Sequence, residues 1–422
     1  MNCYKRLGWN LFMGLCALAV FATGAAANEV VIGFTGPLSG PAAQYGRDNV
    51  AGLEMGVRDI NEAGGITING EQYMFRLTTL DDHADPTAAV NNARRMRDRQ
   101  GIKFIYNPVF TTIAPMMAIN QQRGSEFMMM AYTSTPGVDE IDNDLTIAIP
   151  PPFSAYLQAY SEVAKEKGWQ RGAMLVTLGA YGDDWRSAFR DYWRSIGGEI
   201  VADRPANYYA ETDFSAHLAS VLARNPDFIL IGGPSDPTAL VIEQARGMGF
   251  NGGFLVVDQA KLNYIEHQVF GGDLTLLENC VGVARTLNIG PYEVMEKFHN
   301  RYREEYDMES TSENVLNYSS VKMLARAMEH AQSIDDLEAI KAAFNEFLPM
   351  EPEENLVAYV GIDGSRLLIP ASIQYIEDGQ YADPVASVWW LKDEAEARHV
   401  IEAVIPQTGA DYRHIPLEGY AK

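Results

Sequence analysis

Cysteine and positive charge are both scarce in this sequence. Three cysteines occur in 422 residues, and 33 Lys and Arg stand against 56 Asp and Glu, for a formal net charge of −23. This shortage of cations excludes the dense cationic face that phosphate contacts require, so we expect no nucleic-acid partner. The same charge argues against docking on an anionic membrane surface.

Long apolar runs are also missing beyond the N-terminus. Lys5 and Arg6 precede a short apolar run at 11–22, and Ala25–Ala27 gives a small-residue cleavage pattern. This arrangement is typical of a secretory signal peptide. A membrane anchor is the alternative, but a spanning helix needs about 20 apolar residues. We therefore expect residues 1–27 to be a cleaved signal peptide and the mature protein to be exported.

The three cysteines support the same interpretation. Cys3 and Cys16 lie within the predicted signal peptide, and Cys16 follows Leu15, whereas a lipidated cysteine needs a small residue at that place. Cys280 then remains alone and cannot form an intramolecular disulfide. Because Cys280 lies in a strand-like apolar stretch, we expect a buried, unreactive thiol rather than a nucleophile.

Catalytic and metal-binding motifs are absent as well. The segment 247–252 matches G-x-G-x-x-G, but it follows a helical pattern and opens a strand, the reverse of a dinucleotide site. The seven histidines are scattered, and the acidic residues at 81–85 lack the calcium-loop spacing. Asp85 and Pro86 are better interpreted as the start of a helix. We predict a binding protein without metal or cofactor rather than an enzyme.

Strand-like and helical patterns alternate through most of the chain. The first series ends at Pro150–Pro152, and a second series of the same kind follows. Alternation at this spacing predicts an α/β fold with parallel sheets, and two series predict two sheets. The predicted strands are 30–36, 74–82, 103–109 and 126–132 in the first series, and 171–179, 226–234, 254–258 and 280–284 in the second.

Residues that directly follow the strands are the candidates for function. Ligands of open α/β sheets bind beyond the carboxyl ends of the strands, and two lobes enclose one cleft. The strand-end residues are 38–45, 110–112, 132–135, 180–181, 234–236 and 258–259.

A third segment is mostly helical, at 292–306, 317–332 and 334–347, and a hairpin with its turn at Asp363-Gly364 follows it. The tail from 381 carries an acidic helix at 394–404, which the pattern does not assign to either sheet.

Several quoted segments, in order, resemble one protein family. IGFTGPLSGPAAQYG (32–46), GVRDINEAGGI (56–66), DDHADPTAAVNNARR (81–95), FMMMAYTSTPGV (127–138), LGAYGDDW (178–185) and ARGMGFNGGFLVVD (245–258) resemble the type I periplasmic solute-binding proteins of ABC importers. The nearest group looks like the Leu/Ile/Val-binding proteins. The resemblance covers roughly 30–375.

The resemblance implies two doubly wound parallel-sheet lobes joined by a three-crossing hinge. Lobe 1 would combine 28–149 with 287–362, lobe 2 would combine 150–286 with 363–380, and 381–422 would be a C-terminal extension.

It also implies a periplasmic carrier that delivers an amino acid, most simply a branched-chain one, or a similar carboxylated solute to a membrane permease. We expect a monomer. An aromatic carboxylate or an amide or urea-type solute is one alternative, and a ligand-sensing receptor domain is another.

The resemblance implies a carboxylate site after the third and fourth strands. The matching residues are Phe110, Thr111, Thr112, Tyr132 and Ser134. Hydroxyls and free amides at a helix start suit a carboxylate, although Thr111 and Thr112 would equally serve as helix caps. Phe110 and Tyr132 replace the smaller residues that are common in the family.

The remaining implied ligand contacts come from both lobes. Asp258 matches the family's partner for the ligand's ammonium group, and Tyr45 and Tyr181 match aromatic positions that cover the solute. Pro234 or Ser235 replaces one family aromatic and Glu313 replaces another, so the group bound beside them should differ.

Overall fold

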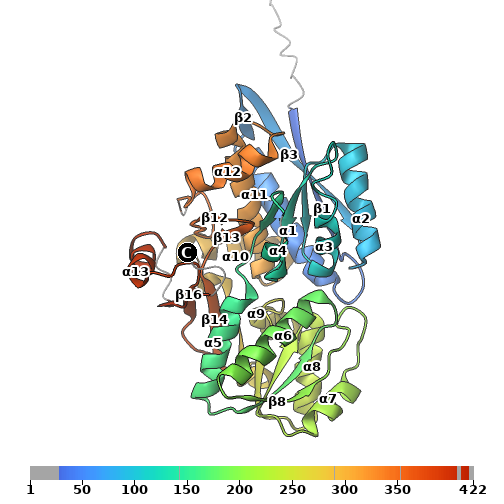
Figure 1. Ribbon diagram of the computed structural model, residues 1–422, viewed down its shortest axis with the longest axis vertical. Helices are drawn as coiled ribbons and strands as arrows, with labels where there is room; N and C mark the ends of the chain where they lie inside the picture. The colour runs from blue at the N-terminus through green and yellow to red at the C-terminus, as the bar shows by residue number, and fades with distance from the viewer. Residues whose placement is uncertain (1–27, 142, 289, 352, 406–409, 418–422) are drawn as a thin grey trace, which may run out of the picture.

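The structure, a computed structural model, describes residues 28–141, 143–288, 290–351, 353–405 and 410–417. The predicted signal peptide lies outside the described residues. The described residues form two sheets, each covered by helices, and the two resulting lobes lie along the long axis of the molecule (Figure 1). This confirms the predicted α/β fold with two parallel-sheet lobes.

The first lobe contains an eight-stranded sheet in the order β12-β13-β6-β5-β4-β1-β3-β2. Its central strands are parallel, as in the pairing of Ile32 with Phe104 and of Phe104 with Met128. The strands are β1 (Asn28–Gly36), β2 (Ile66–Ile68), β3 (Glu71–Asp81), β4 (Phe104–Asn107), β5 (Met128–Ala131), β6 (Thr146–Ala148), β12 (Gly361–Asp363) and β13 (Arg366–Leu368).

The helices of the first lobe come from both ends of the chain. They are α1 (Ala43–Glu62), α2 (Pro86–Arg94) with η1 (Arg95–Arg99), α3 (Phe110–Met117), α4 (Gly137–Glu140), α10 (Tyr292–Tyr306), α11 (Ser312–Ala331) and α12 (Leu337–Phe347). The Asp85 side chain caps α2, as predicted, by accepting from the amide of Ala88 at 2.7 Å. Helices α1 and α11 touch closely, since a Cβ on Gly52 would lie 2.2 Å from the main-chain oxygen of Asn314.

The second lobe contains a nine-stranded sheet in which β8, β7, β9, β10 and β11 are parallel neighbours. Cys280 begins β11 and is fully buried, as predicted, and burial raises the pKa of its thiol to about 12. The strands are β7 (Arg171–Val176), β8 (Glu199–Asp203), β9 (Phe228–Gly232), β10 (Gly253–Val256), β11 (Cys280–Val283), β14 (Ala371–Glu377), β15 (Gln380–Tyr381), β16 (Val385–Val388) and β17 (Asp411–His414).

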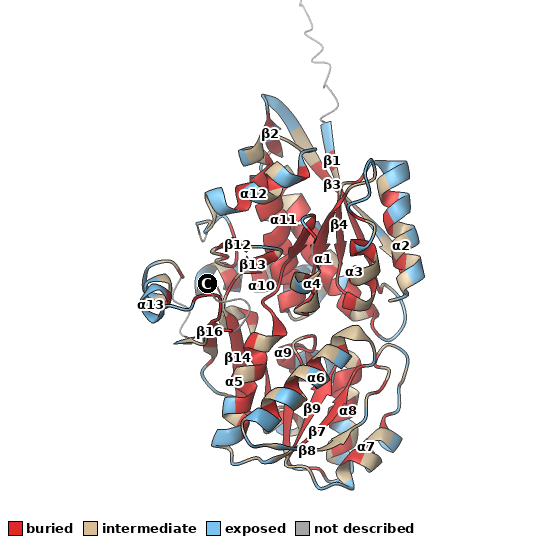
Figure 2. Cartoon of the chain, viewed as in Figure 1, coloured by how far each residue is buried: buried red, intermediate tan, exposed pale blue. Residues whose placement is uncertain are grey.

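Helices cover both faces of the second sheet, and its central strands β7, β9, β10 and β11 are buried (Figure 2). One interior cluster is aromatic: the ring of Trp193 lies 5.9 Å from that of Phe189 and 5.1 Å from that of Phe228. The helices are α5 (Phe153–Glu166), α6 (Ala180–Ser195), α7 (Ser215–Leu222), α8 (Ser235–Gly247), α9 (Leu262–Tyr264) with η2 (Ile265–Val269), η3 (Thr275–Leu277), η4 (Thr286–Asn288) and α13 (Glu394–Ala403).

Across the described residues the chain passes between the sheets after β6, after β11 and after β13. The third crossing differs from the prediction, which began the second lobe at 363. Arg366 pairs with Ala148 of β6, and its buried guanidinium binds Asp139 at 2.7 Å and the main-chain oxygen of Pro150 at 2.7 Å. These contacts hold β13 in the first sheet, so the crossing lies at 369–370.

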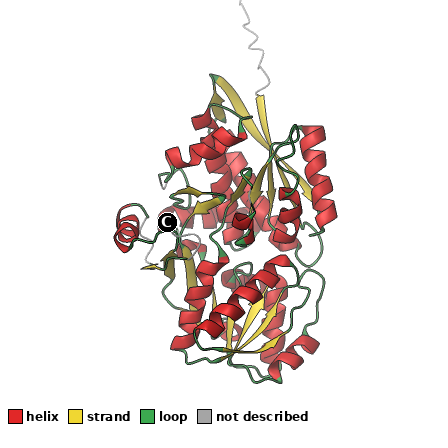
Figure 3. Cartoon of the chain, in the orientation of Figure 1, coloured by secondary structure: helices red, strands yellow, loops and turns green. Residues whose placement is uncertain are grey.

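The C-terminal tail, left unassigned by its pattern, extends the second sheet. β16 pairs antiparallel with β14, and β17 pairs parallel with β16. Figure 3 distinguishes the helices, strands and loops of both lobes by colour. Trp389 is buried and its indole N–H donates to the main-chain oxygen of Ile369 at 2.8 Å, which fixes the tail beside the third crossing. In the part of the chain that the structure describes, every helix is too short or too polar to cross a bilayer.

Candidate functional site

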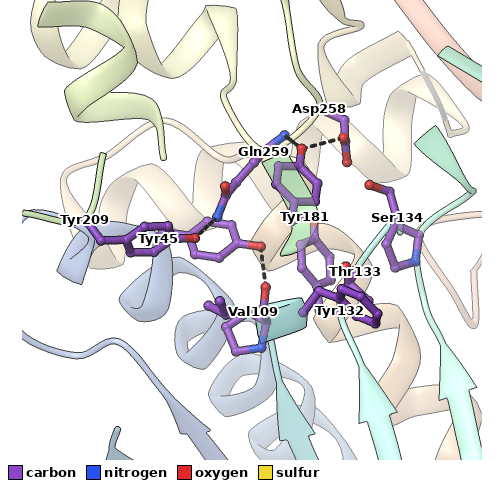
Figure 4. Close-up of a pocket in the computed structure, with 12 residues that line it drawn as sticks. Tyr45, Val109, Tyr132, Thr133, Ser134, Tyr181, Tyr209, Asp258 and Gln259 are labelled. Carbon is purple, nitrogen blue, oxygen red and sulfur yellow. Dashed lines mark hydrogen bonds between the residues drawn. The ribbon is translucent and has the colours of Figure 1, made fainter. Parts of the chain in front are cut away.

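A small cavity lies where the two lobes meet (Figure 4). It sits at the carboxyl ends of parallel strands, because α3 begins directly after β4 and the turn at 132–134 follows β5. The lining residues are Tyr45, Pro108, Val109, Phe110, Tyr132, Thr133, Ser134 and Pro150 from the first lobe, and Tyr181, Tyr209, Asp258 and Gln259 from the second.

Two first-lobe tyrosines form an aromatic part of this lining. The rings of Tyr45 and Tyr132 lie 6.4 Å apart, and the Tyr45 hydroxyl donates to the main-chain oxygen of Pro108 at 2.9 Å. Burial raises the pKa of both phenols well above the usual value. They are therefore neutral at physiological pH, and they offer ring faces and neutral hydroxyls to a ligand.

Asp258 supplies the charge of the cavity. Its Oδ1 accepts from the Tyr181 hydroxyl at 2.7 Å and from the Trp185 indole N–H at 3.0 Å. Burial, followed by the nearby Asp258 charge, raises the pKa of Tyr181 well above the usual value, so the phenol keeps its proton. Two fixed donors on one oxygen orient the carboxylate, and its other oxygen remains available to a cationic donor.

Gln259 extends this network on the second lobe. Its amide N–H donates to the Tyr181 hydroxyl at 3.2 Å, and its side-chain NH₂ donates to the Tyr209 hydroxyl at 2.6 Å. Tyr181 thus contacts two successive residues that follow β10. The network fixes the positions of Tyr181, Tyr209 and Gln259 relative to one another.

Two polar atoms of the lining lack partners among the described residues. Ser134 Oγ and Gln259 Oε1 are buried without a hydrogen bond, one on each lobe. An unsatisfied buried polar group costs about 1–3 kcal/mol. A ligand that accepts from the serine and donates to the glutamine would remove this cost.

The charges of the lining residues limit which groups can bind a ligand carboxylate. Among its described residues there is no Lys or Arg, so a ligand carboxylate must rely on neutral donors. Such donors are Ser134 and the first amides of α3, which precede the helix's own hydrogen bonds. Within the described chain no group of three His, Cys, Asp or Glu is placed to hold a metal ion.

The structure brings most of the predicted residues together. Tyr45, Phe110, Tyr132, Ser134, Tyr181 and Asp258 line the cavity. Pro234 and Glu313 line a neighbouring cavity that also includes Tyr45. Thr111 and Thr112 belong to neither described lining.

The two threonines have local roles instead. The Thr112 hydroxyl lies 2.7 Å from Asn107 Oδ1 and 2.8 Å from the main-chain oxygen of Val109, and the two acceptors share its one hydrogen, so it fixes the start of α3. The predicted contact of this hydroxyl with a ligand stays a prediction. The Thr111 hydroxyl approaches Gly179 of the second lobe, where a Cβ would lie 3.0 Å from it.

Sequence reasoning missed Tyr209 and Lys261. Tyr209 lies in an irregular loop after β8, where no pattern marks it. Lys261 lies three residues beyond Asp258, and its ammonium group binds Glu313 Oε1 at 2.6 Å. Both partners are almost fully buried. The pairing joins one lobe to the other across 52 residues of sequence, a distance at which no local pattern applies.

Comparisons with known proteins agree with this geometry. The family described as "Periplasmic binding protein" matches residues 29–358. A Leu/Ile/Val-binding protein homolog 1 from Brucella melitensis is 26% identical over 348 residues, which covers 79% of this chain and 87% of the relative. The Leu/Ile/Val-binding protein of Escherichia coli is 29% identical over 262 residues, covering 59% of this chain and 66% of that protein.

Solved structures share the fold. A leucine-binding protein, LivK, from Thermotoga maritima has a TM-score of 0.69 at 22% identity and covers 84% of this chain and 97% of its own. The branched-chain amino acid transporter substrate-binding protein LivJ from Streptococcus pneumoniae, in complex with isoleucine, has a TM-score of 0.68 at 18% identity, covering 85% and 99%. The chain therefore belongs to the periplasmic binding protein family, with the type I fold of the Leu/Ile/Val-binding proteins.

Proposed function

We propose that this protein captures an α-amino acid, of the branched-chain type or a similar small carboxylated solute, and delivers it to the permease of an ABC importer. It performs no chemistry on the solute. The observation that carries the proposal is the cavity between the lobes, with Ser134 Oγ unpartnered on one side and the Asp258 carboxylate on the other. A zwitterion supplies one acceptor and one donor that match these two groups.

Binding would join the two lobes through the solute. The α-carboxylate would accept from Ser134 and from the first amides of α3, because a helix start favours negative charge. The α-ammonium would donate to Asp258. The rings of Tyr45, Phe110 and Tyr132 would surround the side chain. Because the two charged ends contact different lobes, the solute stabilises the closed arrangement through a hinge motion.

The surroundings of the protein follow from the same proposal. A carrier that a signal peptide exports works in the periplasm and meets the permease at the membrane. We propose that it acts as a monomer, since two lobes of one chain complete the cavity. Its net charge of −23 disfavours contact with nucleic-acid phosphates, so we propose no nucleic-acid partner.

A second candidate solute is an aromatic carboxylate or a compact amide. Of the twelve described lining residues, five are aromatic: Tyr45, Phe110, Tyr132, Tyr181 and Tyr209. Flat rings pack well between aromatic side chains. Such a solute would use the Ser134 end of the cavity and would leave Asp258 without an ammonium partner.

A thermal-shift screen against α-amino acids, aromatic carboxylates and small amides tests the proposal. A solute at 100 times its dissociation constant adds about 2.7 kcal/mol to the free energy of unfolding, enough for a clear rise in Tm. The proposal expects the largest rise with an α-amino acid. A rise with benzoate-type acids alone would favour the second candidate, and no rise with any small solute would contradict both.

A further inference from the structure

A second small cavity adjoins the first, and Tyr45 lines both. Its carboxylates come from both lobes, Asp48 and Glu313 from the first and Asp236 from the second. Among its described lining residues there is no Lys or Arg. The others that line it are Pro41, Gln44, Pro234, Ser235 and Tyr264.

Glu313 is the most deeply buried of the three acids, with 2% of its surface exposed. Its Oε1 accepts from the Lys261 ammonium at 2.6 Å. That ammonium also donates to the main-chain oxygen of Asp258, so Lys261 is shared. Oε2 of Glu313 is buried and has no hydrogen-bond partner within the described chain. A buried carboxylate oxygen without a donor is costly, and a ligand N–H would satisfy it.

The other two acids, Asp48 and Asp236, add further acceptor oxygens to the pocket. Asp48 is buried, and its two hydrogen bonds, from the Tyr302 hydroxyl at 2.8 Å and from the Gln44 amide at 2.9 Å, both end on Oδ1. Burial, with the Glu313 charge second, raises the pKa of Asp48 to about 7. Burial also raises the pKa of Asp236, which accepts a hydrogen bond from Tyr264. A positive charge among these groups would be attracted by each of them.

We propose that this acidic pocket is a subsite for a cationic nitrogen group, an amine or a guanidine, at the far end of the solute. The inference rests on the proposed function, because the α-carboxylate and α-ammonium of the solute would occupy the first cavity. The distal group would pass beside Tyr45 and donate to Glu313 Oε2 and Asp236. The preferred solutes are then basic amino acids rather than purely aliphatic ones.

The pocket also accounts for the carboxylate at Glu313. An aliphatic side chain would bring only apolar surface to three carboxylates and would leave Glu313 Oε2 without a donor. An amine or guanidine brings several N–H donors and a charge. Hydrogen bonds to charged groups are the strong ones, so the distal group decides between otherwise similar solutes.

Isothermal titration with a matched pair of ligands tests the inference. L-lysine and L-norleucine have the same carbon chain and differ in the terminal ammonium group. L-ornithine and L-arginine place their cationic group at other distances from the α-carbon. Residues 28–422 of the wild type should bind at least one basic amino acid about tenfold or more tightly than norleucine. Asp236→Asn and Glu313→Gln should each reduce this preference, whereas Asp383→Asn, the same change of charge at an exposed site, should preserve it.

The possible outcomes distinguish failure of the subsite from failure of the proposed function. If norleucine and leucine bind as tightly as every basic amino acid, the subsite is refuted while the proposed function stands. If no α-amino acid binds, both are refuted. If the preference for a basic amino acid survives in both acidic-pocket variants, the cation is held elsewhere and the inference is wrong. Should Glu313→Gln fail to fold because Lys261 loses its partner, Asp236→Asn alone decides.

Discussion

Replacing Asp258 by asparagine separates the charge of this residue from its structural role. The Asp258 Oδ1 atom accepts from the Tyr181 hydroxyl at 2.7 Å and from the Trp185 indole at 3.0 Å. An asparagine oxygen accepts both bonds in the same place. The change therefore keeps the positions of the two aromatic side chains and removes the negative charge that would bind the α-ammonium of the solute.

The magnitude follows from the strength of one charge-assisted hydrogen bond. Such a bond contributes about 1.5–3 kcal/mol, and every 1.4 kcal/mol is a tenfold change in Kd, so the affinity for an α-amino acid should fall about 10- to 150-fold. Asp258 is half-buried, and water screens part of its charge, which places the expectation toward the lower end.

Isothermal titration of the wild type and Asp258→Asn with L-leucine and with 4-methylpentanoate measures this. The second compound is leucine without its amino group, so its affinity should be the same for both proteins. Denaturant unfolding of the two proteins without ligand checks that the fold is kept. An unchanged Kd for leucine, or an equal loss for both compounds, would refute the role of Asp258 as the ammonium partner.

Three further predictions concern stability. Burial lowers the pKa of His299 to about 4, so the folded state binds fewer protons than the unfolded state between about pH 6.5 and about pH 4. The free energy of unfolding should fall as pH drops through this window, by up to about 1.4 kcal/mol per pH unit, and His299→Gln should show a shallower fall in urea titrations; an equal slope would contradict this. Gly52→Ala should destabilise the protein despite the better helix propensity of alanine, because its Cβ would lie 2.2 Å from the Asn314 oxygen. Gly247→Ala, which meets no atom within 4 Å, should be neutral or stabilising, and the same sign for both would contradict the close packing of α1 on α11. Phe228→Ala should cost about 3–5 kcal/mol in the same assay, because the side chain is fully buried, and a cost below about 1 kcal/mol would contradict the packing.

Sequence patterns predicted many residues of the cavity because the ends of strands in a parallel α/β fold can be recognised from the sequence. Tyr132 and Ser134 follow β5, Tyr181 begins the helix after β7, and Asp258 follows β10. Each strand is a short apolar run, and its carboxyl end falls at the same edge of the sheet as those of its neighbours. The residue after such a run is therefore placed near the cavity before any side-chain contact is known.

The placement of β13 and the pairing of Lys261 with Glu313 depend on contacts that are distant in sequence, whereas the contacts of Thr112 are local. Arg366 keeps β13 in the first sheet through Asp139 and the oxygen of Pro150, and nothing in the local pattern of 361–368 indicates this. The pairing of Lys261 with Glu313 requires the two lobes to be in contact. Thr112 has the right residue type at the right place, but its hydroxyl is used by the loop that it fixes.

The central claim is that the solute binds between the lobes, and a crystal structure with the amino acid that raises Tm most tests it directly. The account predicts density for the solute between Ser134 and Asp258, with its carboxylate toward the start of α3 and its amino group toward Asp258. Density for the solute at any other place, with the cavity between the lobes free of it, would contradict the account.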